Sequence, residues 1–339
     1  MTAKPIAIVT GGAGFIGSHM VDVLVQAGFR VRVVDNMVGG REQNLAHHAP
    51  NADVSLERKD IRAIQPGDGL FSNVKYVFHF AGIGDIVPSI ERPMEYMSVN
   101  VQGSVHVLEA AREARVEKLV YAASSSCYGL AATPTREDHP ITPQYPYALS
   151  KYQGEQAAFH WHKVYGLPAN SIRIFNAYGT RSRTSGAYGA VFGVFLRQKL
   201  AGKPFTVVGD GTQRRDFVFA SDVARAFLAA AETPLNGETW NVGCNAPQSV
   251  NRLVELLGGS VTYLPKRPGE PDVTWADTAK IERELGWKPR ISFEEGVARI
   301  LENIEYWREA PLWTPDSIAQ ATRTWFQYLD PSAAGAKNG

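Results

Sequence analysis

The stretch IAIVTGGAGFIG, residues 6–17, joins a short apolar run to a glycine-rich turn. Its apolar part is typical of a buried strand, and Gly12, Gly14 and Gly17 have the GxGxxG spacing. Glycines at that spacing let the backbone turn tightly and lie close to a pyrophosphate, whose charge is stabilised at the N-terminus of the next helix. The stretch therefore predicts a strand, a phosphate-binding turn and a helix over residues 18–27, although an isolated GxGxxG also occurs in turns that bind no ligand.

An acidic residue follows the second apolar run, RVRVV at residues 30–34. In a dinucleotide-binding unit, the end of the second strand is the place where a carboxylate accepts hydrogen bonds from the adenine ribose. Asp35 stands there, and its negative charge would repel the 2′-phosphate of NADP. Asp35 therefore favours NAD as the cofactor; the alternative is a solvated acid at a strand end.

Short apolar runs alternate with helical patterns as far as residue 176. Alternating strands and helices pair in parallel through right-handed crossovers, so the sequence predicts an α/β fold with a Rossmann-type, doubly wound parallel sheet. In the helix expected over residues 94–113, four apolar residues from Met97 to Leu108 form a stripe at helical spacing. The other elements expected are strands over residues 6–10, 76–80, 118–123 and 171–175 and a helix over residues 147–165.

The rhythm changes after Asn176, where loops, a short strand FTVV and further helices predict a smaller, mixed α/β C-terminal lobe that binds the substrate. Helices are expected near Asp222, Ser249, Asp277 and Phe293. We expect residues 1–176 to form the NAD-binding domain, with a few later segments returning to it. Residues 177–330 would form the substrate lobe and residues 331–339 a flexible tail.

The composition is that of an ordinary globular protein, with 44% hydrophobic and 20% charged residues among 339. A formal net charge of +1 gives no reason to expect nucleic acid or an anionic membrane as a partner. The two cysteines, Cys127 and Cys244, form no CxxC pair, which favours a cytoplasmic location. No secretory signal, membrane span or metal site is predicted, since no apolar run reaches 18 residues and His160 and His162 diverge on their helix.

Tyr147 and Lys151 share a face of the helix expected over residues 147–165, because they lie four residues apart. An ammonium beside a phenol favours the phenolate, and an unperturbed tyrosine has a pKa of about 10, so a tyrosine base near neutral pH needs such a shift. An isolated YxxxK is also found as a surface pair with the aromatic ring packed down. The pair becomes informative only together with the glycine-rich turn.

The chain resembles the extended short-chain dehydrogenase/reductases, and within them the NAD-dependent nucleotide-sugar epimerase/dehydratase family. It is most similar there to the UDP-glucose and UDP-N-acetylglucosamine 4-epimerases. The resemblance extends from Ile6 to about Trp307. Its segments, in family order, are TGGAGFIG, VVDN, KDIR, HFAG, SVNVQGS, YAASSSCYG, YALSK, IRIFNAYG, GDGTQRRDFVF and RPGEPDVTWAD.

The resemblance implies roles for the matching positions. Tyr147 would be the catalytic base, Lys151 would hold the nicotinamide ribose and tune the tyrosine, and Ser124 would bond the reacting sugar hydroxyl. The other positions that would contact NAD are Gly11, Gly14, Phe15, Ile16, Asp35, Asn36, Asp60, Ile61, Phe80, Ala81, Gly82 and Asn100. Those expected at the nucleotide sugar are Ser124, Ser125, Ser126, Asn176, Arg215, Arg267, Asp85 and Thr274. Arg215 and Arg267 would clamp its diphosphate, since guanidinium forks bind phosphate oxygens bidentately; a surface ion pair is the alternative.

The resemblance also implies the reaction. Tyr147 as phenolate would take the proton of the sugar 4-hydroxyl while a hydride leaves C4 for NAD, and the 4-keto sugar would receive the hydride on its other face. Dehydratases of the family carry Asp and Glu after the catalytic Thr, and decarboxylases usually a Glu in this segment. Ser125 and Ser126 cannot act as carboxylate acids or bases, so they favour a 4-epimerase acting on a UDP-hexose.

Two alternatives stay open: a 4,6-dehydratase or decarboxylase that uses atypical residues, and a non-catalytic NAD-binding sensor or scaffold on the same fold. Thr274 matches the position where a bulky tyrosine restricts some galactose epimerases, so we expect room for a 2-acetamido group. Asp85 would disfavour a uronic acid if it pointed inward, but it could simply face water. The family also implies a homodimer that packs through the helices over residues 94–113 and 147–165.

Overall fold

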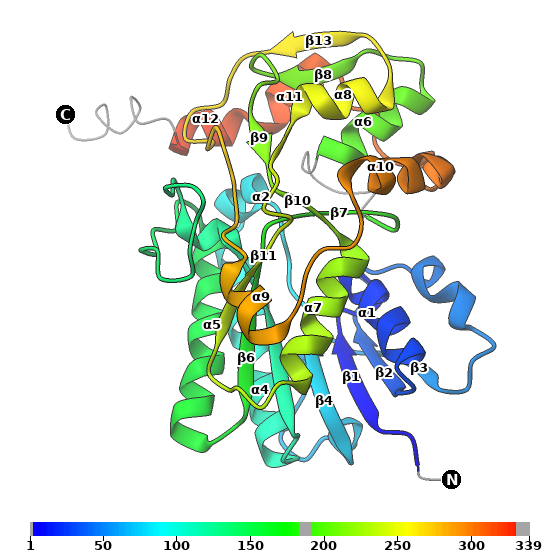
Figure 1. Cartoon of the computed structure of the whole chain (residues 1–339), viewed down its shortest axis with the longest axis vertical. Coiled ribbons are helices and arrows are strands. Elements are labelled where there is room, and N and C mark those ends of the chain that lie inside the picture. Colours follow the sequence, from blue (N-terminus) through cyan, green and yellow to red (C-terminus); the bar gives the residue numbers. More distant parts are fainter. Residues whose placement is uncertain (1–2, 183–190, 330–339) are drawn as a thin grey trace.

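The computed structural model of the chain describes residues 3–182 and 191–329, and within them a parallel seven-stranded sheet forms the lower half of the molecule (Figure 1). Its strand order is β11-β6-β5-β4-β1-β2-β3. The first strand, β1, lies between β2 and β4, so strands are added on one side of β1 up to β3 and on its other side from β4 onward. The strands are β1 (Ile6–Thr10), β2 (Arg30–Asp35), β3 (Val54–Arg58), β4 (Val74–His79), β5 (Lys118–Ser124), β6 (Ala169–Ile174) and β11 (Thr239–Val242).

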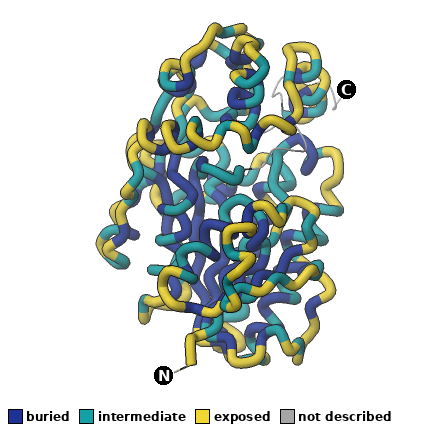
Figure 2. The backbone as a smooth tube through the Cα atoms, turned by 90° about the vertical axis from the view of Figure 1, so that its right-hand side faces the viewer, coloured by how far each residue is buried: buried dark blue, intermediate teal, exposed yellow. Residues whose placement is uncertain are grey.

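Helices cover both faces of this sheet, because its strands are apolar on both sides. Ala7 and Val9 of β1 belong to one core cluster and Ile8 to the other, as the two-residue period of a strand requires. The first face is covered by α1 (Phe15–Gln26) and α7 (Ala220–Glu232), the second by α4 (Gly103–Glu113) and α5 (Pro146–Tyr165). Figure 2 shows buried backbone running through the strands and exposed backbone around them. This confirms the predicted doubly wound α/β fold.

The helix expected over residues 94–113 forms as one run of helical residues, but it contains a π-helical turn. It consists of α3 (Pro93–Met97), a π-helical turn η4 (Ser98–Gln102) and α4. A π turn offsets the side chains that follow it, and such turns are frequent at functional sites. Here the turn carries Asn100, whose buried side chain holds the loop after β4.

A second lobe lies above the sheet in Figure 1 and has its own apolar core of aromatic residues, among them Phe195, Phe205 and Trp307. Three two-stranded sheets form there: β7 (Asn176–Tyr178) with β10 (Phe217–Phe219), β8 (Phe205–Val208) with β13 (Val261–Leu264), and β9 (Arg214–Arg215) with β12 (Gln248–Ser249). Its helices are α6 (Val191–Leu200), α8 (Val250–Leu257), α10 (Phe293–Glu302), α11 (Pro315–Ala321) and α12 (Arg323–Leu329).

Segments from the second half of the sequence also lie with the first lobe. Strand β11 pairs with β6 through Thr239 and Ser171 at one end of the register, and Trp240 is fully buried in the first core cluster. Helix α9 (Ala279–Leu285) joins the same cluster through Ile281. Strand β11 and helices α7 and α9 therefore lie in the first lobe, although they follow residue 176 in the sequence (Figure 1). The boundary at residue 176 stays a prediction. The expected tail over residues 331–339 lies outside the described residues. None of the helices in the described ranges is long and apolar enough to cross a membrane.

Candidate functional site

The glycine-rich turn between β1 and α1 is closely packed against the loop that follows β4. Gly11 has φ +69°, and a Cβ atom there would lie 2.7 Å from the backbone nitrogen of Ala81. A Cβ at Gly17 would lie 2.2 Å from the carbonyl oxygen of Gly11. Gly14 caps α1 without a side-chain hydrogen bond, so the first N–H groups of the helix have no partner from this cap. A bare helix N-terminus behind a tight glycine turn fits a pyrophosphate, and Phe15 and Ile16 form its first turn.

The end of β2 brings the expected adenosine-contacting residues together. Asp35 is buried, and its two carboxylate oxygens accept hydrogen bonds from the backbone N–H groups of Ala13 (3.0 Å) and Met37 (2.8 Å). Burial raises the pKa of Asp35, and the two N–H donors oppose that rise. Each oxygen keeps a further lone pair, so the carboxylate can also accept from ribose hydroxyls.

Asn36 and Asp60 lie beside each other at the same edge, since the Asn36 amide donates to the Asp60 carboxylate over 3.0 Å. Asp60 also accepts from the backbone and guanidinium of Arg62, which together hold its pKa well below the usual range. Ile61 is buried next to Gly103. The four adenosine positions named from the family thus converge, although their contact with NAD stays a prediction.

The loop after β4, with Phe80, Ala81 and Gly82, runs directly over the glycine-rich turn. The backbone N–H of Ala81 donates to Thr10 Oγ1 (3.3 Å). The Asn100 side chain both accepts from the N–H of Ile83 (2.8 Å) and donates to its carbonyl (3.0 Å), which fixes the loop. The centre of the Phe80 ring lies 4.3 Å from that of Phe227 in α7, and Phe80 stays partly exposed.

Ser124, Tyr147 and Lys151 converge at the carboxyl end of β5. Ser124 is the last residue of β5 and is buried, while Tyr147 and Lys151 lie one turn apart in the first half of α5. The side chains of Ser124 and Tyr147 share a hydrogen bond, so their hydroxyls are adjacent. The Lys151 ammonium is buried 4.6 Å from the centre of the Tyr121 ring. The carboxyl end of β5 thus carries a hydroxyl and a phenol in contact, with a buried ammonium one helical turn further along α5.

The pKa of Tyr147 is governed mainly by burial, which raises it. The negative charge of Asp85 raises it further, because a second negative charge opposes a phenolate. Burial likewise lowers the pKa of Lys151 to about 8. The lowering of the Tyr147 pKa that the sequence leads us to expect from Lys151 is therefore not the controlling effect in this structure.

The two serines after Ser124 lie in the short 3-10 turn η5 (Ser125–Tyr128). The backbone N–H of Ser126 donates to Ser124 Oγ (3.2 Å), which caps the turn. A hydrogen bond with the Ser126 side chain lowers the pKa of Tyr145, although burial raises it overall. The ring of Tyr145 lies parallel to that of Tyr147 with centroids 6.4 Å apart. Tyr145 was not among the expected site residues, although it stands two positions before Tyr147.

Residues of the second lobe form the other side of the site. Thr274 Oγ1 donates to the amide oxygen of Asn176 over 2.7 Å, so these two expected sugar-site residues contact each other. The guanidinium groups of Arg215 and Arg267 both lie near the carboxylate of Glu270, at 2.7 Å and 3.8 Å. The two arginines expected to clamp a diphosphate are thus brought together by Glu270, which the sequence reasoning missed.

Asp85 stands in a strained part of the loop after β4. Its φ is +87°, which L residues rarely adopt. The hydroxyl of Tyr96 donates to the carbonyl of the preceding residue, Gly84, and the Tyr96 ring lies 6.3 Å from that of Tyr147. Together with the effect of its charge on Tyr147, this position puts Asp85 on the site side of the loop rather than in bulk water.

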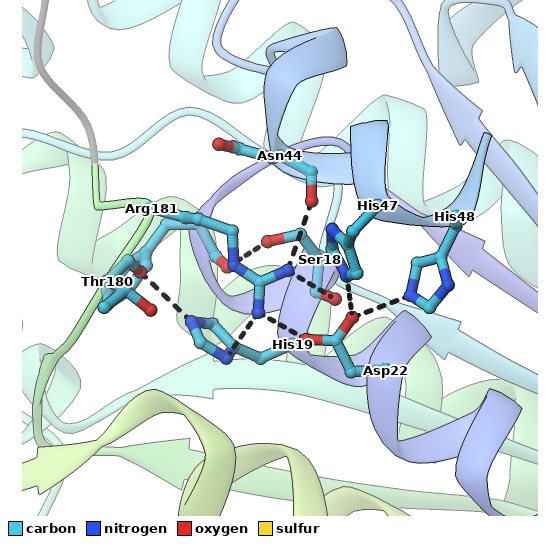
Figure 3. A network of polar contacts seen from close by, with 9 residues as sticks. Ser18, His19, Asp22, Asn44, His47, His48, Thr180 and Arg181 are labelled. Atoms are coloured by element: carbon cyan, nitrogen blue, oxygen red, sulfur yellow. Dashed lines mark hydrogen bonds and ion pairs between the residues drawn. The ribbon is translucent and has the colours of Figure 1, made fainter. Parts of the chain in front are cut away.

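A polar network behind the glycine-rich turn joins the two lobes (Figure 3). Arg181, which follows β7, donates to the backbone carbonyls of Ser18 and Asn44 and to the Asp22 carboxylate. His47 and His48 each approach the other oxygen of that carboxylate, with Nε2 to Oδ1 distances of 2.7 Å. The spacing of these groups would suit a metal ion. Arg181 already engages Asp22, however, and we interpret the cluster as an ion-pair network that holds the lobes together behind the cofactor turn.

Comparison with known proteins shows the family to which this chain belongs. Residues 7–243 match the NAD dependent epimerase/dehydratase family. A UDP-glucose 4-epimerase of Mycolicibacterium smegmatis is 36% identical over 306 residues, which cover 87% of this chain and 97% of that protein. The crystal structure of a Thermotoga maritima UDP-glucose 4-epimerase with UDP-glucose has a TM-score of 0.80 and 32% identity, over 90% of this chain and 99% of that one.

The crystal structure of a Bacillus cereus UDP-glucuronic acid 4-epimerase in complex with UDP-glucuronic acid and NAD has a TM-score of 0.82 and 30% identity, over 89% of this chain and 99% of that one. Other relatives, 29–33% identical, are named as a UDP-glucuronate 4-epimerase, a UDP-sugar decarboxylase and a dTDP-glucose 4,6-dehydratase. The glycine turn, the bare N-terminus of α1 and Asp35 fit the dinucleotide that the family uses. The chain belongs to the NAD-dependent epimerase/dehydratase family, and its cofactor is NAD.

Proposed function

We propose that this protein is a nucleotide-sugar 4-epimerase that inverts C4 of a UDP-hexose. The observation that carries the proposal is the turn after β5, where Ser125 and Ser126 occupy the two positions that follow Ser124. Ser126 is engaged with Tyr145, and neither serine can act as a carboxylate acid or base. Elimination of water across C5 and C6 requires both, so the simplest outcome of C4 oxidation is return of the hydride to the other face.

The residues that would hold NAD are those of the glycine turn and its neighbours. Gly11 and Gly14 would admit the diphosphate and Asp35 would accept from the adenosine ribose, while Lys151 would donate to the nicotinamide ribose. When bound, NAD would accept a hydride from C4 of the sugar and return it to the same carbon. The chain positions the reacting atoms and moves one proton.

Tyr147 would take the proton of the 4-hydroxyl and give it back after the ketone has turned. Ser124 would donate to the same oxygen and hold it next to the phenol, which their mutual hydrogen bond supports. Lys151 would carry a positive charge below about pH 8, and that charge would stabilise the Tyr147 phenolate. Because burial raises the pKa of Tyr147 in the protein without ligands, activation depends on charge brought in by the cofactor and by Lys151.

The substrate proposal rests on the second lobe. Arg215 and Arg267 would bind the diphosphate, with Glu270 holding both guanidinium groups in register before the substrate arrives. Thr274 is smaller than a tyrosine and would leave room for a 2-acetamido group. Asp85 would repel a sugar carboxylate, which favours UDP-Glc/Gal or UDP-GlcNAc/GalNAc over uronic acids.

A homodimer and a cytoplasmic location complete the proposal. The face formed by α4 and α5 would pack against its copy, and Met97, Val101 and Val105 are only half-buried within one chain. Cys127 and Cys244 are both free thiols, as a reducing compartment would keep them.

The test is to incubate the NAD-loaded protein with UDP, dTDP, GDP and CDP sugars and follow inversion at C4 by proton NMR. We expect turnover of a UDP-hexose and loss of turnover in Tyr147→Phe, with NAD content unchanged. A 6-deoxy-4-keto product would indicate a dehydratase, and a pentose a decarboxylase. If every sugar were returned unchanged by an NAD-loaded protein, the sensor or scaffold alternative would replace the epimerase.

A further inference from the structure

Helix α12 (Arg323–Leu329) lies beyond Trp307, where the family resemblance read from the sequence ends, yet it reaches the substrate side of the site. Its residue Trp325 is 4% exposed, whereas its neighbours Phe326 and Tyr328 are 37% and 54% exposed. In Figure 1 the helix lies at the outer edge of the second lobe. A short terminal helix with one buried tryptophan raises the question of what that ring contacts.

The first contact is with the turn that carries Arg267. Trp325 Nε1 donates to the carbonyl of Pro268 over 2.7 Å, and the Arg267 guanidinium lies 5.8 Å from the centre of the indole ring. At the end of the helix, a Cβ on Gly269 would come within 3.1 Å of the Leu329 carbonyl oxygen. Helix α12 therefore packs along three successive residues of this turn.

The second contact is with the catalytic side of the first lobe. The Trp325 ring lies 6.4 Å from that of Tyr145, which in turn is parallel to Tyr147. One residue earlier, Thr324 Oγ1 donates to the carboxylate of Glu91 over 3.0 Å, and Glu91 ends α2 (Ile86–Glu91), the helix that follows Asp85. Helix α12 thus binds the second lobe through Pro268 and the first lobe through Tyr145 and α2.

A cavity borders the C-terminal helices next to Arg267. A cavity of about 340 Å³ lies between α11 and α12 on one side and Val208 and Leu264 on the other, with Phe326 among its lining residues. Within α12 itself, Trp325 is the buried side chain, and its indole N–H holds the helix to the turn that carries Arg267.

We propose that Trp325 is a positioning residue for nucleotide-sugar binding. By donating to Pro268 and stacking under Arg267, it orients the guanidinium that binds the diphosphate, and through Tyr145 and α2 it fixes the distance between that arginine and Tyr147. The inference rests on the proposed function, because it assumes that Arg267 binds the diphosphate of the substrate.

The test compares binding of UDP to NAD-loaded full-length protein by isothermal titration calorimetry. Loss of one hydrogen bond and one cation–π contact at a buried site predicts that Trp325→Ala weakens UDP binding by about tenfold. Trp325→Phe keeps the ring but not the N–H donor, so it should weaken binding by about threefold. Gln327→Ala, two residues on and exposed on the other face of the same helix, is the matched control and should leave UDP affinity unchanged.

Kinetics separate positioning from general destabilisation. In Trp325→Ala the KM for the UDP-hexose should rise in parallel with the dissociation constant of UDP, while kcat at saturation and NAD content stay near the wild-type values. If Trp325→Ala does not fold, the UDP affinity of Trp325→Phe is compared with that of Gln327→Ala. If wild type and the Trp325 variants bind UDP with equal affinity, the role of Trp325 is overturned but the proposed function is not. A wild-type protein that binds no nucleoside diphosphate overturns the proposed function and this inference with it.

Discussion

Acid should weaken the fold through His79, a fully buried histidine at the end of β4. Its Nε2 lies 2.9 Å from Ser104 Oγ, and the Ser104 hydroxyl donates to the carbonyl of Asn100, so Ser104 must accept from Nε2–H. Nδ1 is then unprotonated and accepts from the Thr10 hydroxyl at 2.6 Å. Burial, and to a lesser extent the positive charge of Lys151, lower the pKa of His79 to about 3.

The sign and size of the effect follow from that pKa. An unfolded histidine has a pKa of about 6.5, so between pH 6.5 and pH 3 the unfolded chain binds a proton that the native protein does not. The contribution of His79 to stability is therefore present above pH 6.5 and is lost as the pH falls toward 3. From pH 7 to pH 5 this single residue should lower the free energy of unfolding by about 2 kcal/mol.

The assay is urea unfolding at pH 7 and pH 5, at one fixed NAD concentration, for wild type, His79→Gln and the exposed His160→Gln. Glutamine does not titrate, so His79→Gln should lose about 2 kcal/mol less than wild type between the two pH values. His160→Gln should behave as wild type. His19, whose pKa burial lowers to about 4, titrates in all three proteins and cancels in the comparison. Equal losses in wild type and His79→Gln would refute the reasoning.

Three further changes test the site. Gly11→Ala should destabilise the fold by about 1–3 kcal/mol and abolish NAD retention, because the new Cβ would collide with the Ala81 backbone. Gly28→Ala, the control, also has a positive φ, but its Cβ would meet no atom within 4 Å, so this variant should keep NAD. Urea unfolding measures the stability of both variants, and the bound NAD content measures cofactor retention. Ser124→Ala should lower kcat by about a hundredfold with NAD content unchanged, and Ser124→Thr should restore it; a normal kcat in the alanine variant would remove Ser124 from the mechanism. Thr274→Tyr should reduce kcat/KM for UDP-GlcNAc more than for UDP-glucose, and an unchanged ratio would count against its role in sugar size.

Local patterns in the sequence were enough to predict the glycine-rich turn and the strands β1, β2, β4, β5 and β6, but not β3 or β11. The strands are short apolar runs, and the conformation of Gly11 and the close contact at Gly17 require glycine whatever the rest of the chain does. Asp35 ends β2 as predicted. The helix over residues 94–113 was predicted, but the π turn within it was not, because Asn100 is held by hydrogen bonds to Ile83 and Ser150, which only the folded chain supplies.

The contacts that define the substrate side could not be predicted in the same way. Glu270 pairs with Arg215, and Trp325 lies near Tyr145, only once the chain has folded. No local sequence pattern marks either contact. The contact of the Phe80 ring with Phe227 of α7 is another that no local pattern marks, while the expected contact of Phe80 with NAD stays a prediction. The influence of Asp85 on the Tyr147 phenol likewise depends on a loop held by Tyr96 from another helix.

The most direct test of the central claim is to run the reaction in D₂O with a UDP-hexose and analyse the product by NMR and mass spectrometry. Transfer of a hydride from C4 and back involves no exchange of carbon-bound hydrogen with solvent. We therefore predict a sugar inverted at C4 that carries no deuterium on carbon, formed by wild type and not by Tyr147→Phe. A product with solvent deuterium on the ring, a 6-deoxy-4-keto sugar or a pentose would contradict the assignment as a 4-epimerase.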